Sequence, residues 1–139
     1  MITQLTEPLS ELRDSLDGDL FFDDLHKTLY ATDASVYRQI PVAVAFPKCE
    51  KDIQQLILFA EKNKIGIIPR TAGTSLAGQC VGDGLVVDVS KYFTEVIALD
   101  VHNKTVTVQP GVIRDELNRF LEPLSLIHIS EPTRLGMIS

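Results

Sequence analysis

The sequence has few cysteines, no excess of positive charge and no long apolar run, and each absence excludes a class of protein. Its 139 residues include two cysteines, Cys49 and Cys80, and no CxxC pair, so neither a disulfide framework nor a zinc site is expected. The formal net charge of −6 argues against nucleic acid as a partner, because a phosphate backbone needs concentrated Lys and Arg. No apolar run approaches the roughly 18 residues that a membrane helix requires. We therefore expect a soluble, cytoplasmic protein without a transmembrane segment.

The spacing of the apolar residues predicts alternating helices and strands. Helices are expected over residues 4–16, 20–29, 50–63 and 113–121, and strands over residues 42–46, 65–68, 85–89, 96–99 and 105–109. In the third helix, Cys49 is predicted at the cap position, where cysteine is a weak cap. The predicted buried face of that helix consists of Ile53, Leu56, Ile57 and Ala60. Alternation followed by a hairpin indicates an α+β fold with a small parallel sheet and a second, antiparallel part.

The most informative segment follows the predicted strand at residues 65–68. Small and hydroxyl-bearing residues come directly after Pro69 and Arg70, and the glycines are Gly73 and Gly78. Glycine permits left-handed backbone and the close approach of a ligand. Consecutive amides in such a turn form a concavity that binds anions, and Arg70 adds a cation with a planar fork of donors. The segment therefore predicts a phosphate cradle, most readily for a dinucleotide.

Other interpretations of the glycine-rich segments fit the residues less well. A P-loop needs Lys and Ser or Thr where Gln79 and Cys80 stand. A Rossmann fingerprint needs a third glycine and a following helix, and the Gly82 to Gly84 segment has neither. A serine hydrolase using Ser75 needs a histidine base, for which the sequence offers His26, His102 and His128. This hydrolase and a nucleotide-binding module without redox chemistry stay open as alternatives. Asp88, an acid within a predicted strand, either accepts hydrogen bonds from the loop or faces solvent.

Four more motifs accompany the loop in order along the chain. They are Tyr30–Tyr37, Pro41–Pro47, Gly84–Ser90 and Val106–Val112. With the loop, they resemble the FAD-binding domain shared by the vanillyl-alcohol-oxidase and para-cresol-methylhydroxylase (PCMH) flavoproteins. Within that group the chain is most similar to the FAD-linked subunit of glycolate oxidase and to the D-lactate dehydrogenases. The resemblance covers roughly residues 28–124, and several ordered motifs are more specific than one loop.

The resemblance implies a PCMH-type FAD-binding fold and a set of cofactor-binding residues. The first part of the set would wrap the FAD diphosphate, and the second part would form a turn near the flavin: Arg70, Thr71, Ala72, Gly73, Thr74, Ser75, Leu76, Gly78 and Gln79, then Pro110, Gly111 and Val112. Ala72 stands where many members have glycine. Thr74 stands where some members carry a histidine bonded to the flavin, so the resemblance implies non-covalent FAD.

The resemblance also implies an FAD-dependent oxidoreductase that oxidises a small 2-hydroxy acid, of the glycolate or D-lactate type, and passes electrons to an acceptor. The catalytic residues are expected beyond this chain, which alone should be inactive. We expect a helical lead-in at residues 1–37, a partial FAD-binding domain at residues 38–124 and a discordant tail at residues 125–139. The tail resembles translated sequencing-adapter read-through, which predicts a truncated gene product.

Overall fold

The computed structural model describes residues 5–124, and the chain divides into two compact units. The first unit ends at Phe93 and the second begins at Thr94. This division falls inside the stretch 38–124, and the domain limits expected from the sequence stay a prediction. Within residues 5–124, no helix combines the length and the apolar character that crossing a bilayer requires.

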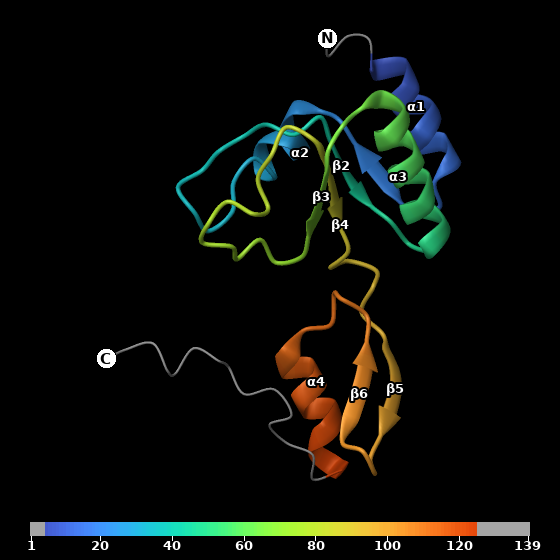
Figure 1. The fold of residues 1–139 in the computed structure, drawn as a ribbon, viewed down its shortest axis with the longest axis vertical. Coiled ribbons are helices and arrows are strands. Elements are labelled where there is room, and N and C mark those ends of the chain that lie inside the picture. The colour runs from blue at the N-terminus through green and yellow to red at the C-terminus, as the bar shows by residue number, and fades with distance from the viewer. Residues whose placement is uncertain (1–4, 125–139) are drawn as a thin grey trace. The chain divides into compact units, whose positions relative to one another are not determined.

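The first unit is built on a four-stranded sheet in the order β1-β2-β4-β3 (Figure 1). Its strands are β1 (Asp19–Phe21), β2 (Ala43–Phe46), β3 (Ile67–Arg70) and β4 (Leu85–Asp88). β2, β3 and β4 run parallel, whereas β1 pairs with β2 antiparallel. β4 lies inside the sheet and is buried at every position, which explains the apolar run at residues 85–87. The parallel sheet is therefore confirmed, with one antiparallel edge strand added.

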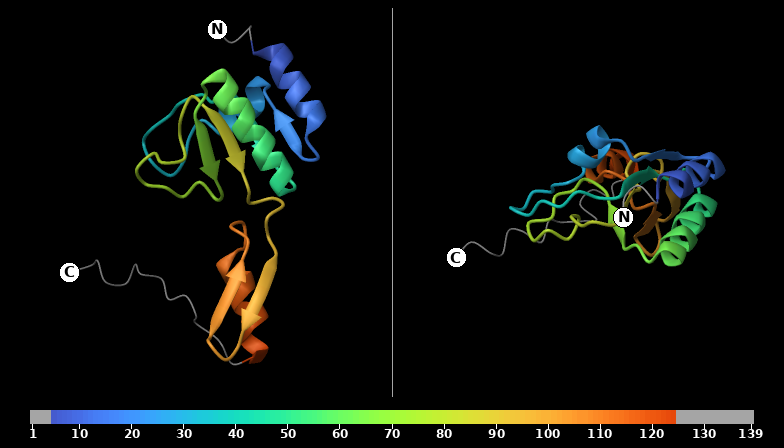
Figure 2. Two further views of the ribbon diagram at one scale, coloured as in Figure 1. Left: turned by 45° about the vertical axis from the view of Figure 1, so that its right-hand side comes forward. Right: turned by 90° about the horizontal axis from the view of Figure 1, so that it is seen from above.

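Helices α1 (Thr6–Ser15) and α3 (Glu50–Asn63) lie side by side and share one core with the sheet (Figures 1 and 2). Leu9 and Leu12 of α1 pack in that core with Leu56 of α3. The bounds of α3 match the prediction, but Ile57 is 49% exposed. The buried positions of α3 repeat every four residues, from Asp52 through Leu56, so the inclusion of Ile57 in the buried face was wrong.

Two strands differ from the sequence prediction. Residues 19–21 form β1 rather than the start of a helix, and helix α2 (Asp24–Leu29) begins after them. The Asp23 carboxylate caps α2 by accepting the amide of His26 at 3.0 Å. A three-residue strand stabilised by its pairing with β2 is too short to leave a periodic pattern. β3 begins two residues later than predicted and contains Pro69, which an edge strand accommodates because no ladder bond is lost on its outer side.

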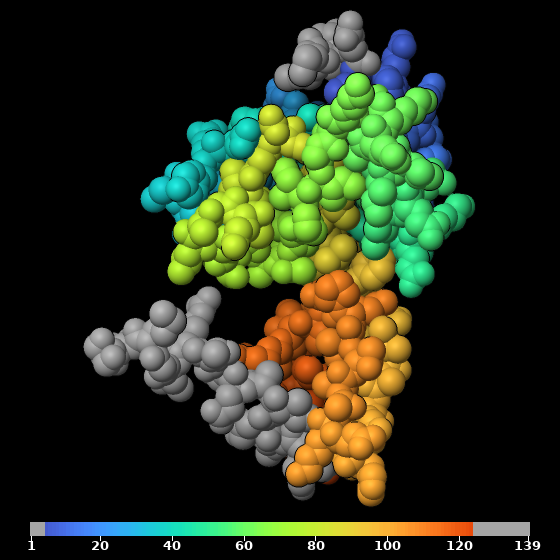
Figure 3. All heavy atoms as spheres, viewed as in Figure 1, coloured from blue at the N-terminus to red at the C-terminus, as the bar shows by residue number. Residues whose placement is uncertain are grey.

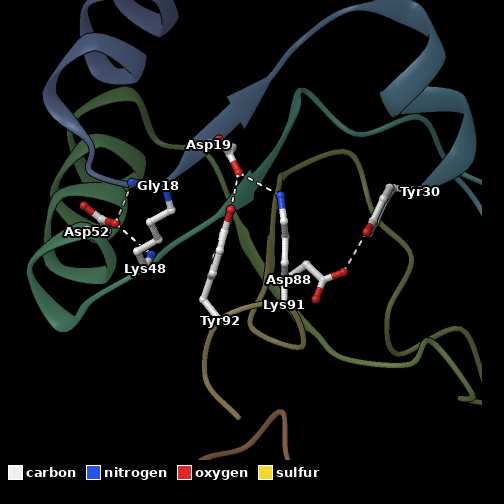
Figure 4. Close-up of polar contacts among 8 residues, drawn as sticks. All are labelled: Gly18, Asp19, Tyr30, Lys48, Asp52, Asp88, Lys91 and Tyr92. Carbon is white, nitrogen blue, oxygen red and sulfur yellow. Dashed lines mark hydrogen bonds and ion pairs between the residues drawn. The ribbon is translucent and has the colours of Figure 1, made fainter. Parts of the chain in front are cut away.

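The amino end of α3 is capped by Asp52, three residues into the helix. Cys49 occupies the N-cap and its side chain makes no capping hydrogen bond, in line with its weak capping ability. The buried Asp52 carboxylate accepts the amide of Asp17 at 2.9 Å. It also accepts the amides of Gly18 at 3.0 Å and Lys48 at 2.8 Å (Figure 4). Burial alone would raise the pKa of Asp52, but the backbone donors outweigh burial and hold this pKa below its ordinary value. One carboxylate therefore ties two connecting segments to the helix.

The second unit is a hairpin followed by a helix. β5 (Val96–Asp100) pairs antiparallel with β6 (Thr105–Val108), and α4 (Arg114–Leu121) and the 3-10 helix η2 (Glu122–Leu124) follow. The Asp100 carboxylate accepts the amides of His102 and Asn103 and so closes the hairpin turn. The predicted hairpin and final helix are confirmed. The expectation of a foreign tail falls on residues 125–139, which lie outside the described residues.

Candidate functional site

The predicted cradle begins where β3 ends. Arg70 and Asp88, the last residues of the parallel strands β3 and β4, are partners in register, so both strands end at one edge of the sheet. The cradle loop, residues 71–79, lies there beside the segment 31–40 (Figures 1 and 3), and the Ala34 amide donates to the Gly73 carbonyl at 3.1 Å. Ligands of open sheets with parallel strands bind outside these carboxyl ends. The topology therefore places the cradle loop where a ligand site is expected.

Both glycines of the cradle loop have left-handed backbone. The φ angle is +64° at Gly73 and +73° at Gly78, a region that costs side-chain-bearing residues energy. A Cβ at Gly73 would lie 2.7 Å from Cζ of Arg70, and a Cβ at Gly78 would lie 2.6 Å from Cδ2 of Tyr37. The loop therefore needs glycine at both positions, for its backbone and for the side chains packed against it.

A run of amides in the cradle loop has no acceptor within the part of the chain that the structure describes. The Ser75 hydroxyl accepts the amides of Ala77 at 3.3 Å and Gln79 at 3.1 Å, and it donates to Oε1 of Gln79 at 2.9 Å. Among the hydrogen bonds of residues 5–124, none is donated by an amide of residues 71–76. Thr71, Ala72, Thr74 and Leu76 are exposed. Ser75 thus shapes the second half of the loop, while the amides of residues 71–76 have no acceptor among the described residues.

A partly buried network around Asp88 supports the loop from the sheet side. The Tyr30 hydroxyl donates to Oδ2 of Asp88 at 2.7 Å (Figure 4), and the Ser90 hydroxyl and amide donate to Oδ1. Burial raises the pKa of Tyr30, and the hydrogen bond to Asp88 raises it further, so this phenol stays protonated. Asp88 is 4% exposed. Of the two roles considered for Asp88, neither holds, because its partners are Tyr30 and Ser90 rather than the loop or solvent.

The segment 31–40 contributes residues that the sequence analysis did not assign to the site. Tyr37, Arg38 and Gln39 line a cavity of about 230 Å³ together with Ala77, Gly78 and Val81. Asp33 accepts the amide of Ser35 at 2.8 Å, and its Oδ2 is buried. The Ser35 hydrogen bond lowers the pKa of Asp33, and the positive charge of Arg70 lowers it further. Asp33 and Ser35 form a typical Asx turn, which was the available sequence signal for an ordered segment here.

Pro110, Gly111 and Val112 belong to the second unit. The Val112 amide donates to the Gln109 carbonyl at 3.1 Å, so these residues form a tight turn between β6 and α4, and Gly111 is buried within it. The turn expected from the sequence is therefore present. Its contact with a flavin stays a prediction.

Two other chemistries find no support in the described geometry. The Ser75 hydroxyl donates to Gln79, an amide that cannot act as a general base, while Nδ1 of His26 pairs with Asp23 and His102 lies in the hairpin turn. Asp17, Cys49 and Asp52 lie close enough to share an ion, but both Asp52 oxygens already accept backbone amides. The cradle loop is thus the better-defined candidate.

Comparison with known proteins identifies the family. A model described as FAD binding domain matches residues 41–137. The chain belongs to this FAD binding domain family. The family and the FAD cofactor predicted from the motifs are therefore confirmed.

Relatives of this FAD binding domain are much longer proteins. D-2-hydroxyglutarate dehydrogenase of Haemophilus influenzae is 37% identical over 118 residues, which cover 83% of this chain and 12% of that protein. Glycolate oxidase subunit GlcD of Bacillus subtilis is 30% identical over 135 residues, 94% of this chain and 29% of that protein. The chain thus spans 12% and 29% of their lengths. Both are oxidoreductases by name.

The fold has solved counterparts. Substrate-bound p-cresol methylhydroxylase superposes with a TM-score of 0.76 at 16% identity, over 89% of this chain and 25% of that chain. At this identity the likeness concerns the fold. It confirms the α+β, PCMH-type architecture.

The residues of the cradle loop fit the diphosphate of FAD. The loop combines consecutive amides that have no acceptor among the described residues with two left-handed glycines, and such a combination can form an anion-binding backbone concavity. Residues 71–79 include no acidic side chain that would repel a diphosphate. Uncommitted donors in a loop that carries no acid of its own suit a phosphate.

Proposed function

We propose that this chain holds FAD non-covalently within a longer flavin-dependent oxidoreductase that oxidises a small 2-hydroxy acid. The observation that carries the proposal is the run of amides at residues 71–76 that have no acceptor among the described residues, in a chain of the FAD binding domain family. These amides would donate to the diphosphate, with Gly73 and Gly78 giving the loop its shape and Ser75 and Gln79 closing it. Pro110, Gly111 and Val112 would flank the flavin.

Bound FAD supplies the acceptor for a hydride from the hydroxyl-bearing carbon of the substrate. The residues of this chain bind and orient the cofactor. The groups that would bind the hydroxy acid and take its proton are expected elsewhere in the full-length protein. We therefore expect the 139-residue chain alone not to turn over. We also propose that the full-length protein passes electrons from the flavin to a separate acceptor and that it is located in the cytoplasm.

Two features support the particular form of the proposal. Thr74 stands at the position where some relatives attach the flavin through histidine, and a threonine hydroxyl does not form that bond. The named relatives act on D-2-hydroxyglutarate and, as a subunit, on glycolate, which share a hydroxyl on the carbon next to a carboxylate. This common group defines the substrate class.

The proposal is tested on the full-length protein that contains this chain. The purified protein should be yellow, and acid precipitation should release the colour into the supernatant. The flavin should then bleach anaerobically with D-2-hydroxyglutarate, D-lactate or glycolate, and a 3-hydroxy acid is the matched negative control. Colour kept on the pellet would contradict non-covalent binding. A yellow protein that no 2-hydroxy acid bleaches would contradict the substrate class, and a colourless protein would favour a module without redox chemistry.

A further inference from the structure

The side chain of Arg70 lies beneath the cradle loop. A Cβ at Gly73 would meet Nη2 of Arg70 and would lie 2.7 Å from its Cζ and 2.9 Å from its Nε. The guanidinium thus fills the space that a side chain at residue 73 would occupy. Gly73 itself is buried. The absence of a side chain at Gly73 therefore makes room for Arg70 as well as for the left-handed turn.

The guanidinium is also fixed on its other sides. Its Cζ lies 4.8 Å from the centroid of the Tyr30 ring, a cation–π arrangement, and its Nη1 donates to the Thr32 carbonyl at 2.8 Å. Tyr30 in turn is held by Asp88 of β4. The Ala34 amide binds the Gly73 carbonyl from the same segment. Arg70 therefore joins the sheet, the segment 30–34 and the cradle loop at one point.

From this arrangement we infer that Arg70 is a positioning residue, which holds the cradle loop in its anion-binding shape through its contacts with Tyr30, Thr32 and Gly73 rather than acting as a direct ligand of the phosphates. The inference rests on the proposed binding of FAD by the loop. Planarity matters for this role, because a guanidinium can lie over a ring and donate at its edge at the same time. A lysine carries the same charge but offers neither the flat face nor the fork. An uncharged methionine has a similar reach and no donor.

The first experiment measures FAD dissociation constants in the full-length protein carrying Arg70→Lys or Arg70→Met. Arg13→Lys, on the exposed face of α1, is the control for an arginine-to-lysine change. Melting temperatures without FAD show that each variant is folded at the temperature of the binding assay. Both Arg70 variants should bind FAD about tenfold more weakly, and within about threefold of each other, because a loosened loop must be reordered on binding.

Two results would overturn the inference. If the lysine variant binds FAD more than about threefold better than the methionine variant, the charge of residue 70 acts directly on the diphosphate. If both variants bind FAD like the wild type, Arg70 positions nothing. A wild-type protein that binds no FAD would contradict the proposed function instead.

A second measurement tests the placement of Arg70 without any cofactor. Gly73→Ala is introduced into the wild type and into the Arg70→Ala background, and the melting temperature of the cofactor-free protein is recorded. The fall should be smaller in the Arg70→Ala background, because the new methyl then meets no guanidinium and only the left-handed φ is unfavourable. Equal falls in both backgrounds would show that Arg70 does not lie against Gly73.

Discussion

The first unit contains two clusters of backbone N–H groups, and they differ in whether the protein supplies a hydrogen-bond acceptor for them. At the start of α3, the amides of Asp17, Gly18 and Lys48 converge on the buried carboxylate of Asp52. In the cradle loop, the amides of residues 71–76 find no acceptor among the described residues. The first cluster holds an anion that the chain supplies. The second is open to an anion from outside.

This difference separates a structural from a binding use of the same backbone chemistry. Converging amides favour negative charge in both places. Where the chain needs only stability, it places an acid within the cluster and buries it. In the cradle loop the chain supplies no acid, and the amides of residues 71–76 have no acceptor among the described residues. Mutations in the cradle loop should therefore change mainly the affinity for FAD, whereas mutation of Asp52 should change mainly the free energy of unfolding.

The largest effect is expected for Gly73→Val in the full-length protein. The branched side chain cannot adopt a φ of +64° without strain and would collide with Arg70, so the amides of the cradle loop would be displaced. Loss of two or three charged hydrogen bonds of about 1.5–3 kcal/mol each should abolish FAD occupancy at micromolar concentrations. Flavin absorbance of the purified variant measures this.

The matched control is Gly66→Val. A Cβ at Gly66 has no atom within 4 Å, so that variant should keep its flavin. Without FAD, the Gly73→Val protein should still be folded at the temperature of the binding assay. The substitution should therefore damage FAD binding more than folding. Normal occupancy in Gly73→Val would refute the assignment of the cradle loop.

The second effect concerns the other cluster. Asp52→Ala leaves three amides without their acceptor and should lower the free energy of unfolding of the cofactor-free protein by about 3 kcal/mol. Urea titration followed by circular dichroism measures the loss. Asp17→Ala, a change of a neighbouring exposed acid, should cost less than about 0.5 kcal/mol. Because Asp52 is a structural anion, the FAD affinity of folded Asp52→Ala should match the wild type; a parallel loss of affinity would break the contrast between the two clusters.

The smallest effect is the pH dependence that Asp52 confers. Its folded-state pKa lies below the unfolded value of about 3.9, so its stabilisation is present above that value and is lost as the pH falls through the folded pKa. The free energy of unfolding should thus decline below about pH 4, by at most about 1.4 kcal/mol per pH unit for this one group. In Asp52→Asn the acid-side slope should be shallower by that contribution. An unchanged slope would show that other carboxylates carry the acid sensitivity.

The sequence predicts the parts of this molecule that local patterns determine. The bounds of α3 could be predicted because apolar residues recur at helical spacing over its fourteen residues. The hairpin β5–β6 could be predicted because two β-prone runs flank a polar turn. The left-handed glycines of the cradle loop could also be expected. Conversely, β1 has three residues and depends on pairing with β2, so it leaves no local signal.

Features decided by distant contacts could not be predicted. The importance of Asp52 depends on amides 34 and 35 residues away, beyond any local motif. The guanidinium of Arg70 contacts the Tyr30 ring and the Thr32 carbonyl, which reach it only in the folded sheet. The loop residues could thus be named from the sequence, whereas the arrangement that supports them required the structure.

The contrast between the two clusters is tested most directly by amide hydrogen exchange in the full-length protein, with and without FAD. FAD should slow exchange at the amides of residues 71–76, because they gain an acceptor. The amides of Asp17, Gly18 and Lys48 should be protected without FAD and should not change when it is added, because Asp52 already binds them. Slow exchange at residues 71–76 without FAD, or no change when FAD binds, would contradict the claim that this loop is the cofactor's anion site.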